Sequence, residues 1–239
     1  MNHLAVIPAR ANSTRLPGKN TMLIAGKSTL AWTIQHLREC TYPLRIVVVS
    51  DDDKAHEIAE AEGVEAVWEP ESLVKQDNLF RVVEYVLEWA GEYDRVLMAY
   101  PEPVRPPGLF DRMIEKMDET GCDVVNVLAR VESHQHPLFY SQISNSGDII
   151  PLALCQIGNS QDFTPVYSNT GAGSLIVASD VPGMAHNRAQ TQLTQIRRAV
   201  IIEPGESVDL DTLLDAKWAE FLLCQNQATS SAVPSTSTT

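Results

Sequence analysis

The sequence predicts an α/β protein with a doubly wound, mostly parallel, Rossmann-like sheet. Short runs of apolar, largely β-branched residues alternate along the chain with segments whose apolar residues recur every third or fourth position. Proline and glycine separate many of these segments. An uninterrupted apolar run is typical of a parallel strand buried on both faces, and the alternation is typical of βαβ units with right-handed crossovers.

The predicted core strands share this apolar, uninterrupted character. In chain order they are residues 3–8, 45–50, 64–68, 95–100, 122–129, 174–179 and 197–204. Pro8 closes the first run, and Pro101 follows the fourth. In an open sheet of this kind, ligands bind at the carboxyl ends of the strands, so the loops that leave those ends are the first places to look for a site.

The predicted helices each carry one apolar stripe. The stripes are Leu30, Ile34 and Leu37; Ala55, Ile58 and Ala59; Leu79, Val82, Val83, Val86, Leu87 and Ala90; Phe110, Met113, Ile114 and Met117; and Leu214, Trp218, Phe221 and Leu222. Residues 1–225 then form a single domain. Residues 226–239 have no apolar periodicity and are predicted to be a disordered tail.

The alternating pattern breaks between residues 130 and 170. This stretch is rich in His, Gln, Ser, Asn and Pro, with short apolar pieces such as "LFYSQI" and "IIPLAL". We interpret it as a small antiparallel excursion from the main sheet that acts as a lid, a dimerisation arm or both. It is too short to bury a core of its own, so we expect it to pack on something else, and we expect a homodimer.

Charge and composition narrow the classes of partner. The 239 residues include 18 Lys and Arg against 31 Asp and Glu, a formal net charge of −13, so we expect no nucleic-acid or membrane partner. No apolar run approaches the roughly 18 residues of a membrane span, and we see no signal peptide. The four cysteines show no CxxC spacing. We therefore expect reduced thiols and a cytoplasmic protein.

A cationic loop follows the first predicted strand. The stretch "PARANSTRLPGKN" (8–20) sets Arg10, Arg15 and Lys19 among small residues, against the overall acidity. Small residues let backbone N–H groups approach an oxyanion, and arginine and lysine complement phosphate, so the loop predicts a polyphosphate site. The stretch lacks the glycines of a Walker A loop or a GxGxxG fingerprint. A solvated basic turn is the alternative.

A second polar motif lies near the far end of the chain. Asp209 and Asp211 are two residues apart, so in an extended segment they point the same way while Leu210 points into the core. Paired carboxylates beside a phosphate site suit Mg²⁺. The alternative is helix capping, with Asp211 or Thr212 starting the last helix and Asp215 in its first turn.

These motifs together resemble the CMP-sialate synthetases and related CMP-sugar cytidylyltransferases. "PARANSTRLPGKN" is similar to that family's P-loop-like signature, and "SVDLDTLLDAKWAE" resembles its terminal acidic motif. "VVVSDDDKAHEIAEAEGVE", "PLFYSQISNSGDIIPL" and "QDFTPVYSNTGA" resemble segments between them, so the likeness runs in order from about residue 3 to 223. The resemblance implies a fold of the nucleotide-diphospho-sugar transferase type.

The resemblance also implies a reaction. A hydroxyl on the anomeric carbon of a sialic-acid-like 2-keto-3-deoxy sugar acid attacks the α-phosphate of CTP, and a CMP-sugar and pyrophosphate form. CTP and the sugar acid would be the partners and Mg²⁺ the cofactor. Such chemistry is catalysed mainly by positioning and charge neutralisation.

Site residues carry over by match to the family motifs. Arg10 and Lys19 would be catalytic, and truncating either should damage turnover more than folding. The implied nucleotide-binding residues are Ala9, Arg10, Asn12, Ser13, Arg15, Lys19 and Asp77. The implied sugar-binding residues are Arg105, Gln161 and Tyr167. Asp209 and Asp211 would hold the metal, and the excursion would dimerise.

The sequence also departs from the family pattern. Ala99 stands for a glutamine and Pro101 for a threonine, Glu69 replaces a common arginine, and Ser160 replaces another. The motifs assigned to sugar binding therefore match the family pattern less well than those assigned to nucleotide binding. The sequence does not identify the sugar acid. Two alternatives stay open: a non-catalytic or regulatory relative that keeps the fold, and a nucleotidyltransferase with a different acceptor or NTP.

Overall fold

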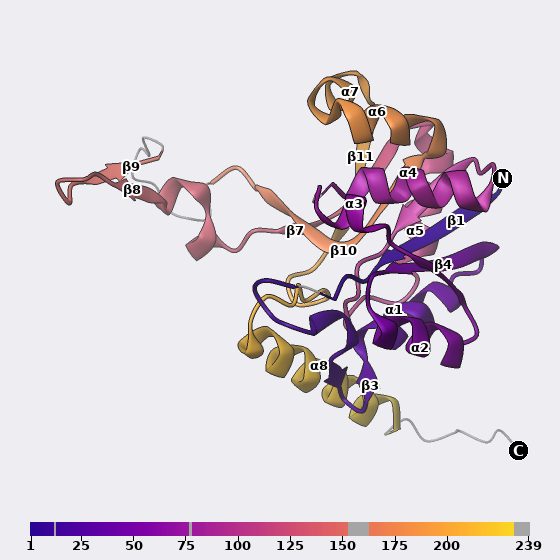
Figure 1. Cartoon of the computed structure of the whole chain (residues 1–239). Coiled ribbons are helices and arrows are strands. Elements are labelled where there is room, and N and C mark those ends of the chain that lie inside the picture. Colours follow the sequence, from indigo (N-terminus) through magenta and orange to yellow (C-terminus); the bar gives the residue numbers. More distant parts are fainter. Residues whose placement is uncertain (12, 77, 153–162, 232–239) are drawn as a thin grey trace, which may run out of the picture.

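A central sheet organises the computed structural model, which describes residues 1–11, 13–76, 78–152 and 163–231 (Figure 1). The strand order is β11-β7-β10-β6-β1-β4-β5. The strands are β1 (His3–Pro8), β4 (Leu44–Ser50), β5 (Glu65–Trp68), β6 (Arg95–Met98), β7 (Val124–Arg130), β10 (Tyr167–Val177) and β11 (Arg197–Ile202). All seven predicted strands form, and the mostly parallel α/β fold is confirmed. Within this sheet, as far as the described residues show it, β10 is the one strand that pairs antiparallel, with both β6 and β7.

Helices cover both faces of the sheet. α1 (Thr29–Arg38), α2 (Asp53–Ala61) and α5 (Leu109–Thr120) share one buried cluster, which includes Ile34 and Met113. α4 (Leu79–Ala90) and α6 (Val181–His186) share the cluster on the other face, which includes Val83 and Met184. α6 is too short to cover the whole of that face, and the short helix α7 (Arg188–Thr194) follows it. Other short helical segments are η1 (Lys19–Thr21), α3 (Glu71–Val74) and η5 (Ala178–Asp180).

A third buried cluster joins the two ends of the chain. The ribbon of β2 (Leu23–Ile24) and β3 (Lys27–Ser28) packs against α8 (Leu213–Ser231). Leu16 from the cationic loop and Leu210 from the acidic motif are both buried in this cluster. The packing therefore brings residues from the beginning and the end of the sequence to one side of the sheet.

α8 differs from its sequence-based prediction in two ways. Among its residues up to 225, Ala219 and Leu223 are buried, while Leu214, Trp218 and Phe221 of the predicted stripe are exposed. The helix docks on the small β2–β3 ribbon, so these three large side chains lie outside the contact. The helix also continues to Ser231, past the predicted boundary at residue 225. Residues 232–239 lie outside the described part.

The predicted antiparallel excursion is confirmed as a hairpin that projects from the sheet (Figure 1). It contains β8 (Ser141–Ile143) and β9 (Ile149–Pro151), and two short helical segments, η2 (Ser133–Gln135) and η3 (Pro137–Phe139), precede it. Its apolar side chains are exposed: Phe139, Tyr140, Ile143, Ile149, Ile150 and Leu152. A lid or dimerisation role stays a prediction. Across the described residues, no helix is both long enough and apolar enough to span a membrane.

Candidate active site

The loop after β1 is tied to the carboxyl end of β4. The Ala9 N–H donates to the Val49 carbonyl at 2.9 Å, and the Ser50 hydroxyl donates to the Ala9 carbonyl. The Ala11 N–H donates to an Asp51 carboxylate oxygen at 2.7 Å. The start of the loop is therefore rigid, and the backbone N–H of Ala9 is already engaged within the protein.

A cavity of about 560 Å³ opens beside this loop at the carboxyl edge of the sheet. We call it the loop cavity. Arg10, Ser13, Arg15 and Lys19 line it together with Asp209, so the structure brings the cationic loop and the acidic motif together as expected. The other residues of its wall are Pro8, Asn20, Leu79, Tyr100, Pro101, Glu102, Asn169, Thr170, Gly171 and Leu210.

Arg10 is held by a buried carboxylate. Its Nε lies 2.9 and 3.0 Å from the two oxygens of Glu69, one Nη lies 2.7 Å from Oε1, and the same group reaches the Leu73 carbonyl at 3.3 Å. The Glu69 side chain is fully buried, whereas that of Arg10 is 21% exposed. Glu69 is one of the departures from the family pattern, and here it neutralises the first cation of the loop.

Lys19 and Arg15 meet the two acidic residues near the end of the chain. The Lys19 ammonium lies 3.8 Å from Asp209 and 3.4 Å from Asp211, and Arg15 contacts Asp211. The two carboxylates therefore converge on one point, which a cation occupies. The expected inward direction of Leu210 is confirmed, because that side chain is 1% exposed. Burial of Leu210 leaves both neighbouring carboxylates on the side that Lys19 approaches.

Asp215 has a different task. Its carboxylate accepts from the Thr212 N–H at 2.7 Å and from the Asp211 N–H at 3.1 Å, and the Asp215 N–H in turn lies 3.3 Å from the Thr212 hydroxyl. This reciprocal arrangement is a capping box at the start of α8. Desolvation acts to raise the pKa of Asp215, but these hydrogen bonds, together with the charge of Lys19, outweigh it and hold the pKa below its usual range. Capping is thus done by Thr212 and Asp215, and the carboxylates of Asp209 and Asp211 are left to the cations of the loop.

Arg105 lies elsewhere than the family match implied. Its guanidinium is buried and donates to the carbonyls of Ala172 at 2.8 Å and Glu102 at 2.6 Å, and to that of Tyr100. It also contacts the Thr33 hydroxyl at 3.1 Å. Arg105 does not line the loop cavity. The sequence-based assignment to sugar binding is therefore corrected: Arg105 holds the backbone of the segment after β6, because buried backbone carbonyls need donors.

The remaining predicted residues are scattered. Tyr167 is exposed at the start of β10, where it pairs with Arg130, and it lines neither cavity described here. Asn12, Asp77 and Gln161 lie outside the described residues, as does the departure at Ser160.

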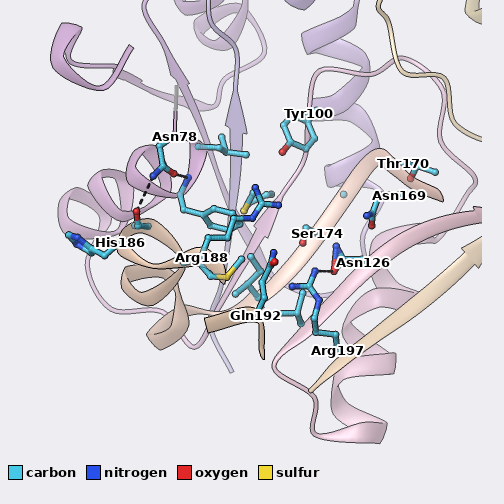
Figure 2. Close-up of a pocket in the computed structure, with 18 of the residues that line it drawn as sticks. Asn78, Tyr100, Asn126, Asn169, Thr170, Ser174, His186, Arg188, Gln192 and Arg197 are labelled. Carbon is cyan, nitrogen blue, oxygen red and sulfur yellow. Dashed lines mark hydrogen bonds between the residues drawn. The ribbon is translucent and has the colours of Figure 1, made fainter. Parts of the chain in front are cut away.

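A larger cavity of about 910 Å³ lies on the sheet face that carries α4 and α6, with some of its lining residues drawn in Figure 2. We call it the sheet-face pocket. Asn126 from β7, Ser174 from β10 and Arg197 from β11 rise from the strands, and Arg188 and Gln192 enter from α7 (Figure 2). The pocket shares Leu79, Tyr100, Asn169 and Thr170 with the loop cavity, so the two spaces adjoin.

The sheet-face pocket is suited to an anion with many hydroxyl groups. No acidic residue is among its described lining residues, although the protein is strongly acidic. Arg197 donates to Asn126 at 3.1 Å, and its other terminal nitrogen is buried with no hydrogen-bond partner among the described residues. Desolvation and the charge of Arg188 lower the pKa of Arg197. Two neighbouring arginines that repel each other are stabilised by an anion between them.

Sequence reasoning missed this second group of residues. One signal was available: Asn126 is a polar residue inside the apolar run "CDVVNVLA". Ser174 pairs with Asn126 across two strands, and Arg197 lies beside them. Both placements depend on the order of the strands in the sheet, which a single apolar run does not reveal.

Comparisons with known proteins identify the family of this chain. Residues 4–201 match the family described as Cytidylyltransferase. The chain is 29% identical over 235 residues to CMP-N,N'-diacetyllegionaminic acid synthase of Legionella pneumophila, covering 95% of this chain and 98% of that protein. It is 27% identical over 177 residues to N-acylneuraminate cytidylyltransferase of Streptococcus agalactiae, covering 72% of this chain and 42% of that one.

A third relative acts on another sugar acid by name. It is 3-deoxy-manno-octulosonate cytidylyltransferase of Pseudomonas fluorescens, 35% identical over 108 residues, covering 45% of this chain and 42% of that protein. Among solved structures, a CMP:2-keto-3-deoxy-manno-octonic acid synthetase complexed with CTP has a TM-score of 0.73 at 15% identity, covering 95% of this chain and all of that one. The match over most of the chain, together with the cationic loop and the acidic motif at one cavity, shows that this protein belongs to the cytidylyltransferase family, among the CMP-sugar cytidylyltransferases.

Proposed function

We propose that this protein couples CTP to a sialic-acid-like 2-keto-3-deoxy sugar acid, giving a CMP-sugar and pyrophosphate. The observation that carries the proposal is the pair of adjoining cavities. One is lined by the cationic loop and the acidic motif, and the other is polar, free of acidic residues in its described wall and equipped with two arginines. They meet at Tyr100, Asn169 and Thr170, where the two substrates would be joined.

The loop cavity is the proposed nucleotide site. It lies at the carboxyl edge of a parallel sheet, where such folds bind ligands. Arg15 and Lys19 line it and complement the negative charge of a triphosphate. Ser13 offers a hydroxyl to a phosphate oxygen. Arg10 contributes through its pair with Glu69, which holds the beginning of the loop in place.

The sheet-face pocket is the proposed sugar-acid site. The acceptor carboxylate would lie against Arg197 and Arg188, and the hydroxyl and acylamino groups would meet Asn126, Ser174 and Gln192. The volume of the pocket is within the range of small-molecule sites. The names of the Legionella and Streptococcus relatives support a sugar acid of the sialic type.

The reaction needs positioning and charge neutralisation more than covalent chemistry. The hydroxyl oxygen on the anomeric carbon attacks the α-phosphorus, and a new P–O bond forms as the hydroxyl proton passes to water. The bond from the α-phosphorus to the oxygen that bridges it to the β-phosphate breaks, and pyrophosphate leaves. Lys19 and Arg15 would offset the charge that gathers on the phosphates. The wall formed by Tyr100, Asn169 and Thr170 would hold the acceptor oxygen in line with the α-phosphorus.

Asp209 and Asp211 fit Mg²⁺. Their carboxylates converge on the Lys19 ammonium, which shows that one cation can lie close to both. Among the described residues no cluster of three or more His, Cys, Asp or Glu could hold a metal, so the remaining ligands would be phosphate oxygens and waters. When bound, Mg²⁺ would neutralise phosphate charge. Lys19 would then be released from the two aspartates to contact the nucleotide.

The test is pyrophosphate release with CTP, ATP, GTP and UTP against a panel of sugar acids, with and without Mg²⁺. Signal only with CTP, a sialic-type acid and Mg²⁺ supports the proposal. Arg197→Ala should raise the KM for the sugar acid about tenfold or more while the KM for CTP stays near wild type. Arg198→Ala is the matched control, because Arg198 is exposed next to it and outside the pocket. Nucleotide binding without turnover would instead favour a non-catalytic relative.

We also propose that the projecting hairpin forms a homodimer. Its exposed apolar residues, among them Ile143 and Ile149 at 66% and 72% exposure, lie on a segment that cannot bury them itself. Static light scattering at micromolar concentration should give twice the monomer mass. Ile143→Asp combined with Ile149→Asp should return the monomer mass. A monomer in the wild type would contradict the proposal.

A further inference from the structure

Glu102 places a buried carboxyl at the wall of the loop cavity. Its side chain is almost completely buried, at 2% exposure for the residue, yet it lines the cavity. Oε2 accepts a hydrogen bond from the Ser207 hydroxyl at 3.1 Å. Oε1 is buried and has no hydrogen-bond partner within the described part of the chain. A buried polar atom without a partner is costly, so its presence in a cavity wall calls for an explanation.

The backbone at Glu102 is held rigidly. Its N–H donates to the Thr33 hydroxyl at 3.0 Å, and its carbonyl accepts from Arg105 at 2.6 Å and from Thr33 at 3.1 Å. Thr33 is on α1, which is packed in the core. The backbone of Glu102 is therefore fixed beside the cavity, and rotation of its side chain is the freedom that remains to the carboxyl.

Gly171 makes room for this carboxyl. A Cβ at position 171 would lie 1.8 Å from Glu102 Oε1, far inside contact distance. Gly171 lies in β10 where the pairing with β7 shifts register between Asn169 and Ser174, so this irregularity brings a side-chain-free backbone against Glu102. The constraint is steric, because the φ angle of Gly171 is outside the left-handed region.

The electrostatic surroundings keep both protonation states accessible. Burial raises the pKa of Glu102 to about 7, and the charge of Asp209 adds to the rise, while Arg105, Ser207 and Lys19 act in the opposite direction. The carboxyl can therefore present Oε1 as an acceptor or, when protonated, as a donor. A hydroxyl group can satisfy either form, because it both donates and accepts.

We propose that Glu102 is a substrate-binding residue whose carboxyl hydrogen-bonds a hydroxyl of a bound substrate in the loop cavity, and that Gly171 is required to seat it. The inference rests on the proposed function, because it needs a substrate with hydroxyl groups in that cavity. The hydroxyl belongs either to the ribose of the nucleotide or to the sugar acid at the junction with the sheet-face pocket. The chemistry is the same for both sources, and the experiment separates them.

The first experiment compares Glu102→Ala and Glu102→Gln with the wild type by calorimetric CTP titration and by KM for each substrate. Glu102→Ala should weaken one substrate about tenfold, and Glu102→Gln should stay within about threefold, because an amide keeps a hydrogen-bonding oxygen and gains a donor. If the loss falls on CTP and disappears with 2′-deoxy-CTP or 3′-deoxy-CTP, the partner is a ribose hydroxyl. If it falls on the sugar acid, the partner is the acceptor. Glu88→Ala, an exposed carboxylate on α4, is the control.

The second experiment tests whether Gly171 is needed to position the Glu102 carboxyl. Gly171→Ala should weaken the same substrate as Glu102→Ala, and adding Gly171→Ala to Glu102→Ala should cost little more, because the clash has lost its target. The inference would be overturned if the losses of affinity in Gly171→Ala and Glu102→Ala were additive in the double variant. It would also be overturned if a folded Glu102→Ala protein kept its affinities for CTP and for the sugar acid. Thermal melting of each variant confirms folding. Calorimetric CTP affinity is read without turnover. A wild type that binds CTP but turns over no sugar acid therefore counts against the proposed function and leaves the Glu102 test intact.

Discussion

Replacing Arg10 with alanine should destabilise the folded protein strongly, even though Arg10 lies on a loop. The sequence alone suggested that this change would damage turnover more than folding. The structure alters that expectation, because the Glu69 carboxylate is fully buried and Arg10 meets both of its oxygens. Without Arg10, Glu69 would be a buried charge that has lost its arginine partner.

The size of the effect follows from this burial. Breaking a buried ion pair by removing one partner costs about 3–5 kcal/mol, and we take the lower end because Arg10 is 21% exposed. For a chain of this length, about 3 kcal/mol corresponds to a fall in Tm of roughly 6–12 °C. Arg10→Ala with Glu69→Gln should recover much of this, because a neutral amide costs far less to bury than a carboxylate.

The assay is thermal denaturation followed by circular dichroism, without nucleotide, so that ligand binding does not contribute. Arg38→Ala is the matched control, because Arg38 pairs with Glu62 at 3.2 Å on the surface, with 45% and 32% exposure. An exposed pair contributes about 0–1 kcal/mol. If Arg10→Ala and Arg38→Ala melt at the same temperature, or if the double variant is no more stable than Arg10→Ala, the reasoning about the Glu69 pair is wrong.

Three further predictions concern charge. Lys19→Ala should slow turnover with a loss of about 2–4 kcal/mol in the barrier and little change in Tm, and steady-state kinetics at wild-type level would remove Lys19 from the mechanism. Asp209→Asn and Asp211→Asn should each raise the Mg²⁺ concentration for half-maximal rate, whereas Asp215→Asn should mainly lower Tm; equal Mg²⁺ dependence in all three would contradict the metal assignment. Burial, with the charges of Arg105 and Lys27 adding to it, lowers the pKa of His36 to about 3, so the unfolded chain binds this proton more readily and stability should fall as pH drops below about 6.5. Denaturant unfolding at pH 7.5 and 5.5 should show about 1 kcal/mol less stability at the lower pH, and His36→Gln should reduce that difference.

Much of the architecture could be predicted from local patterns. Each core strand is an apolar run, and runs such as "RIVVVS" become strands buried in the sheet because both faces are covered by helices. The approach of Arg15 and Lys19 to Asp209 and Asp211 also followed from the sequence, since loops that leave parallel strands meet at one edge. Periodicity was a poorer guide to α8, where the small residue Ala219 is buried and the large Trp218 is exposed.

The remaining features of the candidate site were decided by contacts between residues that are distant in the sequence. Pairing of Arg10 with Glu69, and of Arg105 with backbone carbonyls, depends on which groups are buried together, and residue type alone does not reveal this. The sheet-face pocket likewise arises because β10 inserts antiparallel between β6 and β7, which sets Ser174 beside Asn126 under a face that the short helix α6 covers only in part. A local sequence pattern determines which segments become strands and helices. Their order in space, and hence the chemistry of the surfaces between them, is determined by tertiary packing.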